Sequence, residues 1–201
     1  MRYDMGNNAH EKKIYLITGN PHKFEEINAL FKNHFLNYKL ELKNANPIEI
    51  QADDLVEVAL FKLNSIKDKI NDSCFVEDAG FFIDHPLQGF PGVYSSHVFK
   101  KIGNQGILKL IDDPSRSRAR FKAVIALYFK PHDKVYVFEG EVLGKVAAKI
   151  RGSQGFGYDP IFIPNAMPHK TFGELTKEEK NNLSHRAMAI KKLIDFLKKN
   201  P

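Results

Sequence analysis

The segment ITGNPHKFEEI, residues 17–27, combines the features of a phosphate-binding turn. It follows a short apolar run, and Asn20 followed by Pro21 is typical of the start of a helix. Free backbone N–H groups and the positive end of a helix dipole bind phosphate well, and Lys23 adds a mobile ammonium in the first turn. The alternative is that Asn20 only caps the helix while Lys23 is solvated, and this stretch taken alone favours that alternative.

Lys62 falls inside the apolar stripe of a second predicted helix, residues 54–70. The apolar members of the stripe recur at helical spacing: Leu55, Ala59, Leu63, Ile66 and Ile70. Lys62 comes two helical turns after Leu55, so its side chain points to the same side of the helix. It either extends its ammonium to solvent from the edge of the stripe or directs a cation into a cleft.

Carboxylates in two other segments could hold a metal ion. Glu77 and Asp78 end an extended segment, and because neighbouring strand residues face opposite ways, only one of them need enter a given site. Glu49 stands among apolar neighbours just before a helix. Carboxylates that converge repel each other unless a cation joins them, and Mg²⁺ prefers oxygen ligands and phosphate. Ordinary acids at strand ends are the alternative for each residue alone.

The segment RGSQGFGYDP, residues 151–160, is rich in glycine where the backbone must bend or approach a ligand closely. It matches neither a P-loop nor a G-x-G-x-x-G fingerprint. Phe156 and Tyr158 could stack a flat base, or the segment could be a simple long turn. Further along, Lys170, His185 and Arg186 lie near two helix starts.

The elements that must position these residues are mixed strands and helices. Apolar or alternating runs predict strands at residues 13–18, 38–43, 74–77, 81–83, 120–129, 134–142 and 145–150. Capping residues and helical spacing predict helices at residues 24–35, 54–70, 104–111 and 185–197. The short gaps between the strands after residue 119 favour antiparallel pairing. The expected fold class is α/β with a long mixed sheet.

The composition places few limits on function. The chain has 201 residues, a formal net charge of +6 and a sequence pI near 9.2, which suits a polyanionic ligand of several kinds. Cys74 is the one cysteine, so no intrachain disulfide can form, and a reducing cytoplasm is expected. We expect a flexible extension at residues 1–12, a single domain at residues 13–201, and no membrane span, because no long apolar run occurs.

Taken together, these segments resemble the inosine triphosphate pyrophosphatase (Ham1-like) family, hydrolases of deaminated purine nucleotides. The resemblance covers residues 14–197 and rests on five motifs in this order: TGNPHKFEE, VEDAG, GFPGVYSS, GFGYDPIF and TFGELTKEEKNNLSHRA. It implies an elongated two-lobed α/β fold around a long central mixed sheet, with the nucleotide cleft between the lobes. It also implies a homodimer that cleaves noncanonical purine triphosphates (ITP, dITP, XTP) to monophosphate and pyrophosphate with Mg²⁺, keeping them out of DNA and RNA.

The family's site residues match positions throughout this chain. The resemblance implies metal binding by Glu49 and Asp78, and Asp78 also matches the proton acceptor. The implied substrate-binding residues are Thr18, Gly19, Asn20, Pro21, His22, Lys23, Lys62, Ala79, Phe156, Gly157, Tyr158, Asp159, Lys170, His185 and Arg186. Ala79 departs from the family, which usually has serine or threonine there. A missing neutral hydrogen bond costs about 0.5–1.5 kcal/mol, so affinity is expected to fall while the chemistry survives.

Two rival functions remain at this point. A Maf-type pyrophosphatase would act on pyrimidine or modified nucleotides, but that group usually begins with a Ser-Pro-Arg-Arg-like turn where this chain has Asn-Pro-His-Lys. A nucleic-acid-binding module would use the positive charge, yet the lysines and arginines are dispersed and many stand beside acids. We therefore expect no nucleic-acid partner.

Overall fold

The computed structural model describes residues 12–32, 34 and 36–201. The extension predicted at residues 1–12 lies outside this part of the chain, except for Lys12, the first residue of a strand. In the described residues, the strands are β1 (Lys12–Ile17), β2 (Tyr38–Lys43), β3 (Ser73–His85), β4 (Pro91–Gly92), β5 (Arg118–Phe129), β6 (Lys134–Val146) and β7 (Phe162–Pro164). The α-helices are α1 (Pro21–Lys32), α2 (Leu55–Asn64), α3 (Ser95–Lys109), α4 (Lys177–Leu183) and α5 (His185–Lys199).

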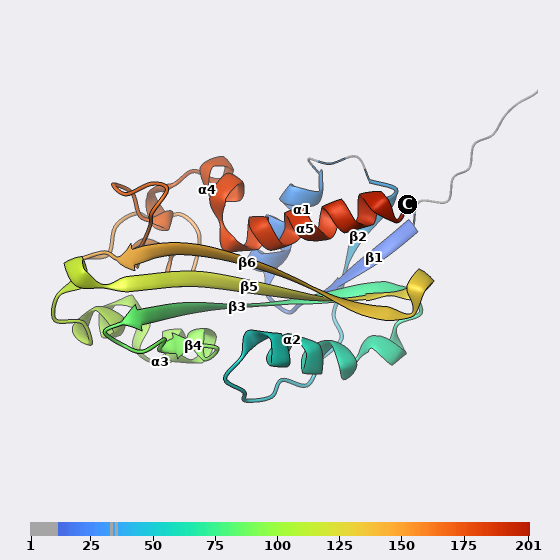
Figure 1. Ribbon diagram of the computed structural model, residues 1–201, viewed down its shortest axis with the longest axis horizontal. Coiled ribbons are helices and arrows are strands. Elements are labelled where there is room, and N and C mark those ends of the chain that lie inside the picture. The colour runs from blue at the N-terminus through green and yellow to red at the C-terminus, as the bar shows by residue number, and fades with distance from the viewer. Residues whose placement is uncertain (1–11, 33, 35) are drawn as a thin grey trace, which may run out of the picture.

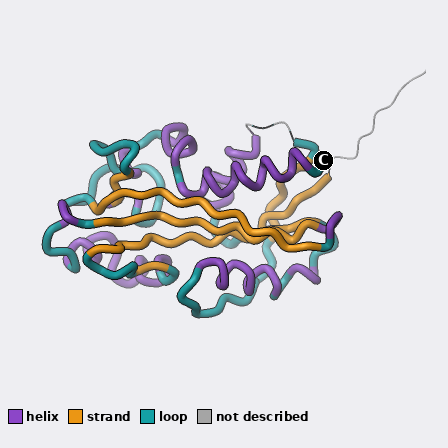
Figure 2. Tube along the Cα trace, viewed as in Figure 1, coloured by secondary structure: helices purple, strands orange, loops and turns teal. Residues whose placement is uncertain are grey.

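These strands form one mixed sheet, as the sequence predicts. Their order is β2-β1-β3-β5-β6-β7, with β4 paired to β3. β1 pairs in parallel with β2 and β3, whereas the other neighbours are antiparallel. β3, β5 and β6 run the length of the molecule, with α1, α4 and α5 above them and α2 and α3 below (Figure 1). Figure 2 shows the strands as one band between these two layers.

Three clusters of buried side chains hold the layers together, and strand alternation distributes residues between them. Phe75 packs with Leu193 of α5 on one face of the sheet. Its neighbour Val76 packs with Leu63 of α2 on the opposite face. Phe162 belongs to the third cluster, which includes residues of β3, β5, β6 and α3. The sheet therefore separates α1 and α5 from α2 near β1, where the site residues gather.

Side-chain oxygens cap the starts of α2, α4 and α5. Asp54 accepts a hydrogen bond from the backbone N–H of the second residue of α2 through its Oδ1. Thr176 and Glu179 form a capping box at the start of α4. Ser184 caps α5, where the predicted apolar spacing buries Ile190 and Leu197. No helix in the described part of the chain is long and apolar enough to cross a lipid bilayer.

The strand predicted at residues 145–150 is wrong. β6 continues to Val146, after which the N–H of Ala147 donates to the carbonyl of Ile161 at 2.8 Å, and the segment turns away from β5. The strand that completes this end of the sheet is β7, which pairs with the last residues of β6. The apolar residues Val146 and Ala147 are buried where β6 ends, and they do not form a further strand.

The helix predicted at residues 54–70 is also shorter than expected. α2 ends at Asn64, because the hydroxyl of Ser65 donates to the carbonyl of Lys62 at 2.8 Å, offering the backbone an alternative to further helix. The same hydroxyl accepts the N–H of Ile48 at 3.0 Å. Ser65 thereby holds the end of α2 against the loop that precedes it.

Candidate functional site

The turn predicted to bind phosphate lies where β1 ends and β3 continues. The parallel pairing of these strands runs from Ile14–Ser73 to Leu16–Phe75, so β3 extends past the end of β1. The chain turns at residues 18–20 and enters α1 directly. In α/β sheets, ligands bind beyond the carboxyl ends of parallel strands, at places where a strand leaves its neighbour. The described geometry therefore offers a binding position beside the middle of β3.

Local hydrogen bonds shape this turn. Asn20 donates its N–H to Thr18 Oγ1 at 3.1 Å. Its Oδ1 accepts the N–H groups of His22 at 3.0 Å and Lys23 at 3.3 Å, so Asn20 caps α1 before Pro21 occupies the first helical position. The space where a Cβ of Gly19 would lie is open. The turn is thus preset, with its small residue facing free space.

Lys23 is not solvated as the simpler alternative expected. Its Nζ lies 2.8 Å from Glu77 Oε2 and donates to the carbonyl of Glu77 at 3.0 Å. The Lys23 side chain is 16% exposed and that of Glu77 is 1% exposed. An ammonium from α1 is therefore fixed directly above β3.

Lys62 reaches the same stretch of β3 from the opposite face. Its Nζ lies 2.5 Å from Glu49 Oε1 and 3.2 Å from Asp78 Oδ1. Burial works against the charge of Lys62, but Asp78 and Glu49 more than offset this and raise its pKa above the usual value. The interruption of the apolar stripe is explained, because Lys62 is 8% exposed and bridges two acids. Ser65, at the end of α2, holds the Glu49 loop within reach.

The two acids of this group have different environments. Burial raises the pKa of Asp78 despite the nearby charges of Lys23 and Lys62. The pKa of Glu49 is lowered, mainly by its hydrogen bond from Lys62, and its side chain remains 65% exposed. The pKa of Asp78 is therefore raised by burial, whereas that of Glu49 is lowered by its hydrogen bond from Lys62.

These acids fit a Mg²⁺ ion that also binds phosphate. Asp78 Oδ2 is buried and has no hydrogen-bond partner among the described residues, and Glu49 approaches the same ammonium as Asp78. Within residues 12–32, 34 and 36–201, no three His, Cys, Asp or Glu side chains gather as a closed metal site. Mg²⁺ usually binds through one or two carboxylates, water and substrate phosphates, so two convergent acids suffice.

A second group of residues lies around Phe156. The ring of His22, at the start of α1, stacks on Phe156 with centroids 5.5 Å apart. Arg186 and Lys180 approach the same ring, at 5.4 Å and 5.1 Å from its centroid. Gly157, next in the loop, has open space around its Cβ direction. The predicted base-binding loop therefore meets both the phosphate-binding turn and the start of α5.

The side chains of Tyr158 and Asp159 point away from this opening. Tyr158 is 3% exposed and its hydroxyl donates to the carbonyl of Ser95 at 3.0 Å, so its ring belongs to the core and cannot stack a base. Asp159 accepts the N–H of Phe156 at 2.8 Å and pairs with Lys180 at 2.7 Å. Asp159 holds the loop in shape, and the expected aromatic stacking rests on Phe156 alone.

Arg186 is held by two carboxylates. Its Nη1 pairs with Glu26, and its Nε and Nη2 both lie 3.1 Å from Glu77 Oε1. Burial disfavours the charge of Arg186, but Glu77 and Glu26 raise its pKa above the usual value. The guanidinium is thus fixed as a cation beside Phe156.

His185 is buried beside Arg186. Its ring stacks on Phe121 with centroids 4.7 Å apart, and its Nδ1 has no hydrogen-bond partner in the described part of the chain. Burial, and then the positive charge of Arg186, hold the pKa of His185 well below its usual value. The imidazole is therefore neutral, with an unused polar atom.

Lys170 lies outside both groups. Its side chain is exposed and pairs with Glu179 at 3.0 Å on the surface of α4. The lysine that the structure brings to Phe156 is Lys180, which is 5% exposed and also pairs with Glu26 at 2.7 Å. Sequence reasoning missed Lys180 because α4 is short and almost wholly polar, so it has no apolar stripe against which a buried lysine would stand out.

Sequence reasoning also missed the role of Glu26, although a signal existed. Glu26 follows Lys23 by three residues in α1, which places both on one helical face, whereas Glu25 is exposed. Ala79, next to Asp78 in β3, packs against the cluster that contains Phe75. Because it is an alanine, it offers no hydroxyl to a ligand.

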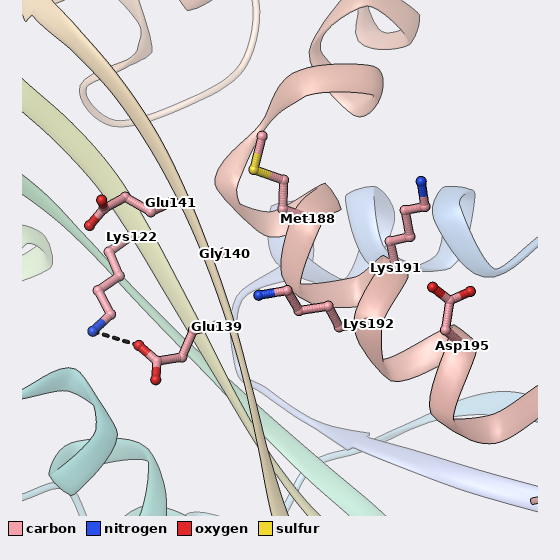
Figure 3. A pocket seen from close by; sticks show the side chains of 8 residues that line it. All are labelled: Lys122, Glu139, Gly140, Glu141, Met188, Lys191, Lys192 and Asp195. Carbon is pink, nitrogen blue, oxygen red and sulfur yellow. Dashed lines mark ion pairs between the residues drawn. The ribbon is translucent and has the colours of Figure 1, made fainter. Parts of the chain in front are cut away.

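A wide hollow elsewhere on the molecule does not contain any of these residues. It measures about 600 Å³ and lies between β6 and α5 (Figure 3). Lys122 and Glu139 pair at 2.7 Å on one side of it, and Lys191 and Lys192 reach it from α5. Its size alone gives no chemistry, because its charges are exposed and mixed in sign.

The chain is similar to known proteins over nearly its whole length. The model of the Ham1 family matches residues 14–196. A dITP/XTP pyrophosphatase from Pyrococcus horikoshii is 46% identical over 188 residues, which cover 94% of this chain and 98% of that protein. One from Thermococcus kodakarensis is 43% identical over 188 residues, with the same coverage.

The solved structure of a HAM1 protein from Coxiella burnetii has a TM-score of 0.80 and 30% sequence identity. The match covers 94% of this chain and 99% of that one. The family model and these relatives span nearly the whole sequence, including every segment that contributes to the site. This chain belongs to the Ham1 family.

Proposed function

We propose that this protein hydrolyses noncanonical purine nucleoside triphosphates (ITP, dITP and XTP) to the monophosphate and pyrophosphate. The observation that carries the proposal is the approach of Lys23 and Lys62 to neighbouring residues of β3 from opposite faces, beside the acids Glu49 and Asp78. Two cations and a metal-binding pair are what a triphosphate requires. The relatives match nearly the whole chain, and their names support the same substrate class.

In the proposed reaction, water attacks the α-phosphorus in line with the bond to the oxygen that bridges the α- and β-phosphates. That bond breaks, and pyrophosphate leaves with the bridging oxygen. Asp78 positions the water and accepts its proton, a role that suits a carboxylate whose pKa is raised by burial. Lys23 and Lys62 neutralise phosphate oxygens, because catalysis of phosphoryl transfer is mostly positioning and charge stabilisation.

Glu49 and Asp78 would hold Mg²⁺. The ion would supply neutralisation of charge on the pyrophosphate that leaves. Lys62, which already joins the two acids, keeps them from repelling each other before the nucleotide binds. Lys23 would then neutralise phosphate oxygens on the side of the phosphate chain opposite to Lys62.

Base choice is proposed to depend on the substituent at position 6. Hypoxanthine and xanthine have a keto oxygen there, and adenine has an amino group. Arg186 and the backbone N–H groups of Gly157 and Tyr158 would pair with the oxygen but face another donor in adenine. Each buried unpaired donor costs about 1–3 kcal/mol. Two such donors together cost about 2–6 kcal/mol, which at about 1.4 kcal/mol per decade gives a discrimination of about 30-fold to 10⁴-fold.

The homodimer and the cytoplasmic location implied by the family resemblance are part of the same proposal. Cys74 is buried as a free thiol, which fits a reducing compartment. Size-exclusion chromatography with light scattering tests the dimer, because a monomeric mass at micromolar concentration would exclude it.

The decisive experiment measures pyrophosphate release from ITP, XTP, ATP, dUTP and UTP, with and without Mg²⁺. We expect pyrophosphate release from ITP and XTP to be at least about thirtyfold more efficient than release from ATP, and to occur only with the metal. Asp78→Asn should abolish turnover while nucleotide binding persists, and full activity in that variant would refute the assigned role. Preference for dUTP or UTP would favour the Maf-type alternative. Absent hydrolysis together with a salt-sensitive gel shift would favour nucleic-acid binding.

A further inference from the structure

One buried carboxylate touches cations of both halves of the site. Glu77 Oε2 lies 2.8 Å from Lys23 Nζ, and Glu77 Oε1 lies 3.1 Å from both Nε and Nη2 of Arg186. The side chains of Glu77 and Arg186 are 1% and 2% exposed, so water does not screen these contacts. Lys23 belongs to α1 and Arg186 to the first turn of α5, so Glu77 joins elements that are distant in sequence.

Glu77 faces away from the two metal-binding acids. Alternation along β3 sends Phe75 and Glu77 toward α1 and α5, whereas Val76 and Asp78 point toward α2. Both oxygens of Glu77 already contact cations. Glu77 therefore lies between Lys23 and Arg186 and not beside Glu49.

We propose that Glu77 is a positioning residue that couples binding of the triphosphate tail to recognition of the base. This rests on the proposed function, in which Lys23 binds phosphate and Arg186 faces the base. Because a single rigid carboxylate holds both cations, a shift of either one changes the partner available to the other. Among the described side chains, Glu77 alone contacts both Lys23 and Arg186, since Glu26 pairs with Arg186 and Lys180 but not with Lys23.

The coupling makes discrimination against adenine depend on Glu77. A guanidinium held on Nε, Nη1 and Nη2 cannot turn away from the wrong base, so its remaining N–H groups are left facing a donor. When Glu77 is neutral, Arg186 keeps only Glu26 and can adjust to either base. Lys23 loses its ionic partner at the same time and binds the tail in a less defined position.

The test compares wild type with Glu77→Gln, which keeps the shape of the side chain and removes its charge. Two readouts are needed, and neither depends on the fraction of active enzyme. The first is the ratio of kcat/KM for ITP to kcat/KM for ATP, which probes the base. The second is the competitive inhibition constant of pyrophosphate, which has no base and probes the tail. Glu25→Gln is the matched control, because Glu25 is exposed on the same helix as Lys23.

We expect Glu77→Gln to lower the ITP-to-ATP ratio at least tenfold and to raise the inhibition constant of pyrophosphate at least fivefold. The control should change neither by more than twofold. A change in only one readout would overturn the coupling, because Glu77 would then serve one cation alone. Equal losses for ITP and ATP would also overturn it, since a merely structural residue scales both substrates together.

A third measurement separates positioning from metal binding. The Mg²⁺ concentration for half-maximal activity should stay within twofold of wild type in Glu77→Gln, and a tenfold increase would make Glu77 a ligand and overturn the proposal. If circular dichroism shows Glu77→Gln to be unfolded, Glu77→Asp is measured by the same criteria, because its shorter side chain cannot reach both cations. If wild type does not prefer ITP over ATP, the proposed function itself is wrong. If wild type prefers ITP and the ITP-to-ATP ratio of Glu77→Gln is unchanged, only the proposed coupling by Glu77 is wrong.

Discussion

Replacing Gly155 by alanine tests how the loop that bears Phe156 is held. Gly155 has a φ of +73°, in the left-handed region that side chains disfavour. A Cβ at this position would lie 2.0 Å from Asp159 Oδ2, so the carboxylate would have to move. That oxygen accepts the N–H of Phe156 at 2.8 Å and pairs with Lys180 at 2.7 Å. The substitution therefore disturbs both the backbone and the buried carboxylate that shapes the loop.

The expected cost has two parts. The left-handed conformation costs alanine about 1–2 kcal/mol. Displacing Asp159 gives up a hydrogen bond to a charged group, worth about 1.5–3 kcal/mol. The sum is about 2.5–5 kcal/mol of unfolding free energy. Gly157→Ala is the matched control, because Gly157 has a φ of +63° but no atom within 4 Å of the Cβ position, so only the first part applies.

Urea unfolding followed by circular dichroism, without nucleotide, measures both variants. Gly155→Ala should be less stable than Gly157→Ala by about 1.5–3 kcal/mol, since the cost of the backbone conformation is common to both. Gly155→Ala should also lose preference for ITP over ATP as Phe156 moves. Equal stability of the two variants would refute the reasoning that Asp159 requires the space above Gly155.

Three further predictions concern single side chains. Lys62→Met should lower kcat/KM for ITP by about 10²–10³-fold, the loss typical of one charge-stabilising donor, and unchanged kinetics would exclude Lys62 from the site. Glu49→Gln should raise the Mg²⁺ concentration for half-maximal activity at least about tenfold, measured by metal titration of pyrophosphate release. The pKa of His185 is held well below 6.5, so below that pH the unfolded chain binds a proton that the folded protein does not. Stability should thus fall by up to about 1.4 kcal/mol per pH unit as the pH drops below 6.5. The unfolding free energy of His185→Phe, measured with urea, should fall less between pH 7.5 and 5.5 than that of wild type. An equal fall in the two proteins would contradict this.

Periodicity and capping predicted most of the fold. Ser184 and Thr176 cap helix starts by hydrogen bonds to nearby backbone N–H groups, which depend on local sequence. The apolar residues of α5 recur at helical spacing and are buried. The strand predicted at residues 145–150 is wrong because the short apolar run Val146–Ala147 is buried at the end of β6 and does not begin a new strand. Its true successor, β7, has three residues, too few for any periodicity to indicate.

The sequence points to a candidate site residue where that residue contradicts its local pattern. Lys62 stands in an apolar stripe, and its burial between two acids explains why. Lys180 contradicts no pattern, because its helix is polar, and only the tertiary fold shows that it is buried. The sequence also did not show that the Tyr158 ring is buried, since an aromatic residue in a glycine-rich loop can face either a ligand or the core.

The most direct test of the central claim is a crystal structure of the wild-type protein with Mg²⁺ and α,β-methylene ITP, in which carbon replaces the bridging oxygen. We expect one triphosphate chain in contact with Lys23 and Lys62, a metal ion on Glu49 and Asp78, and the base beside Phe156. A nucleotide bound elsewhere, or a tail that contacts only one of the two lysines, would contradict it.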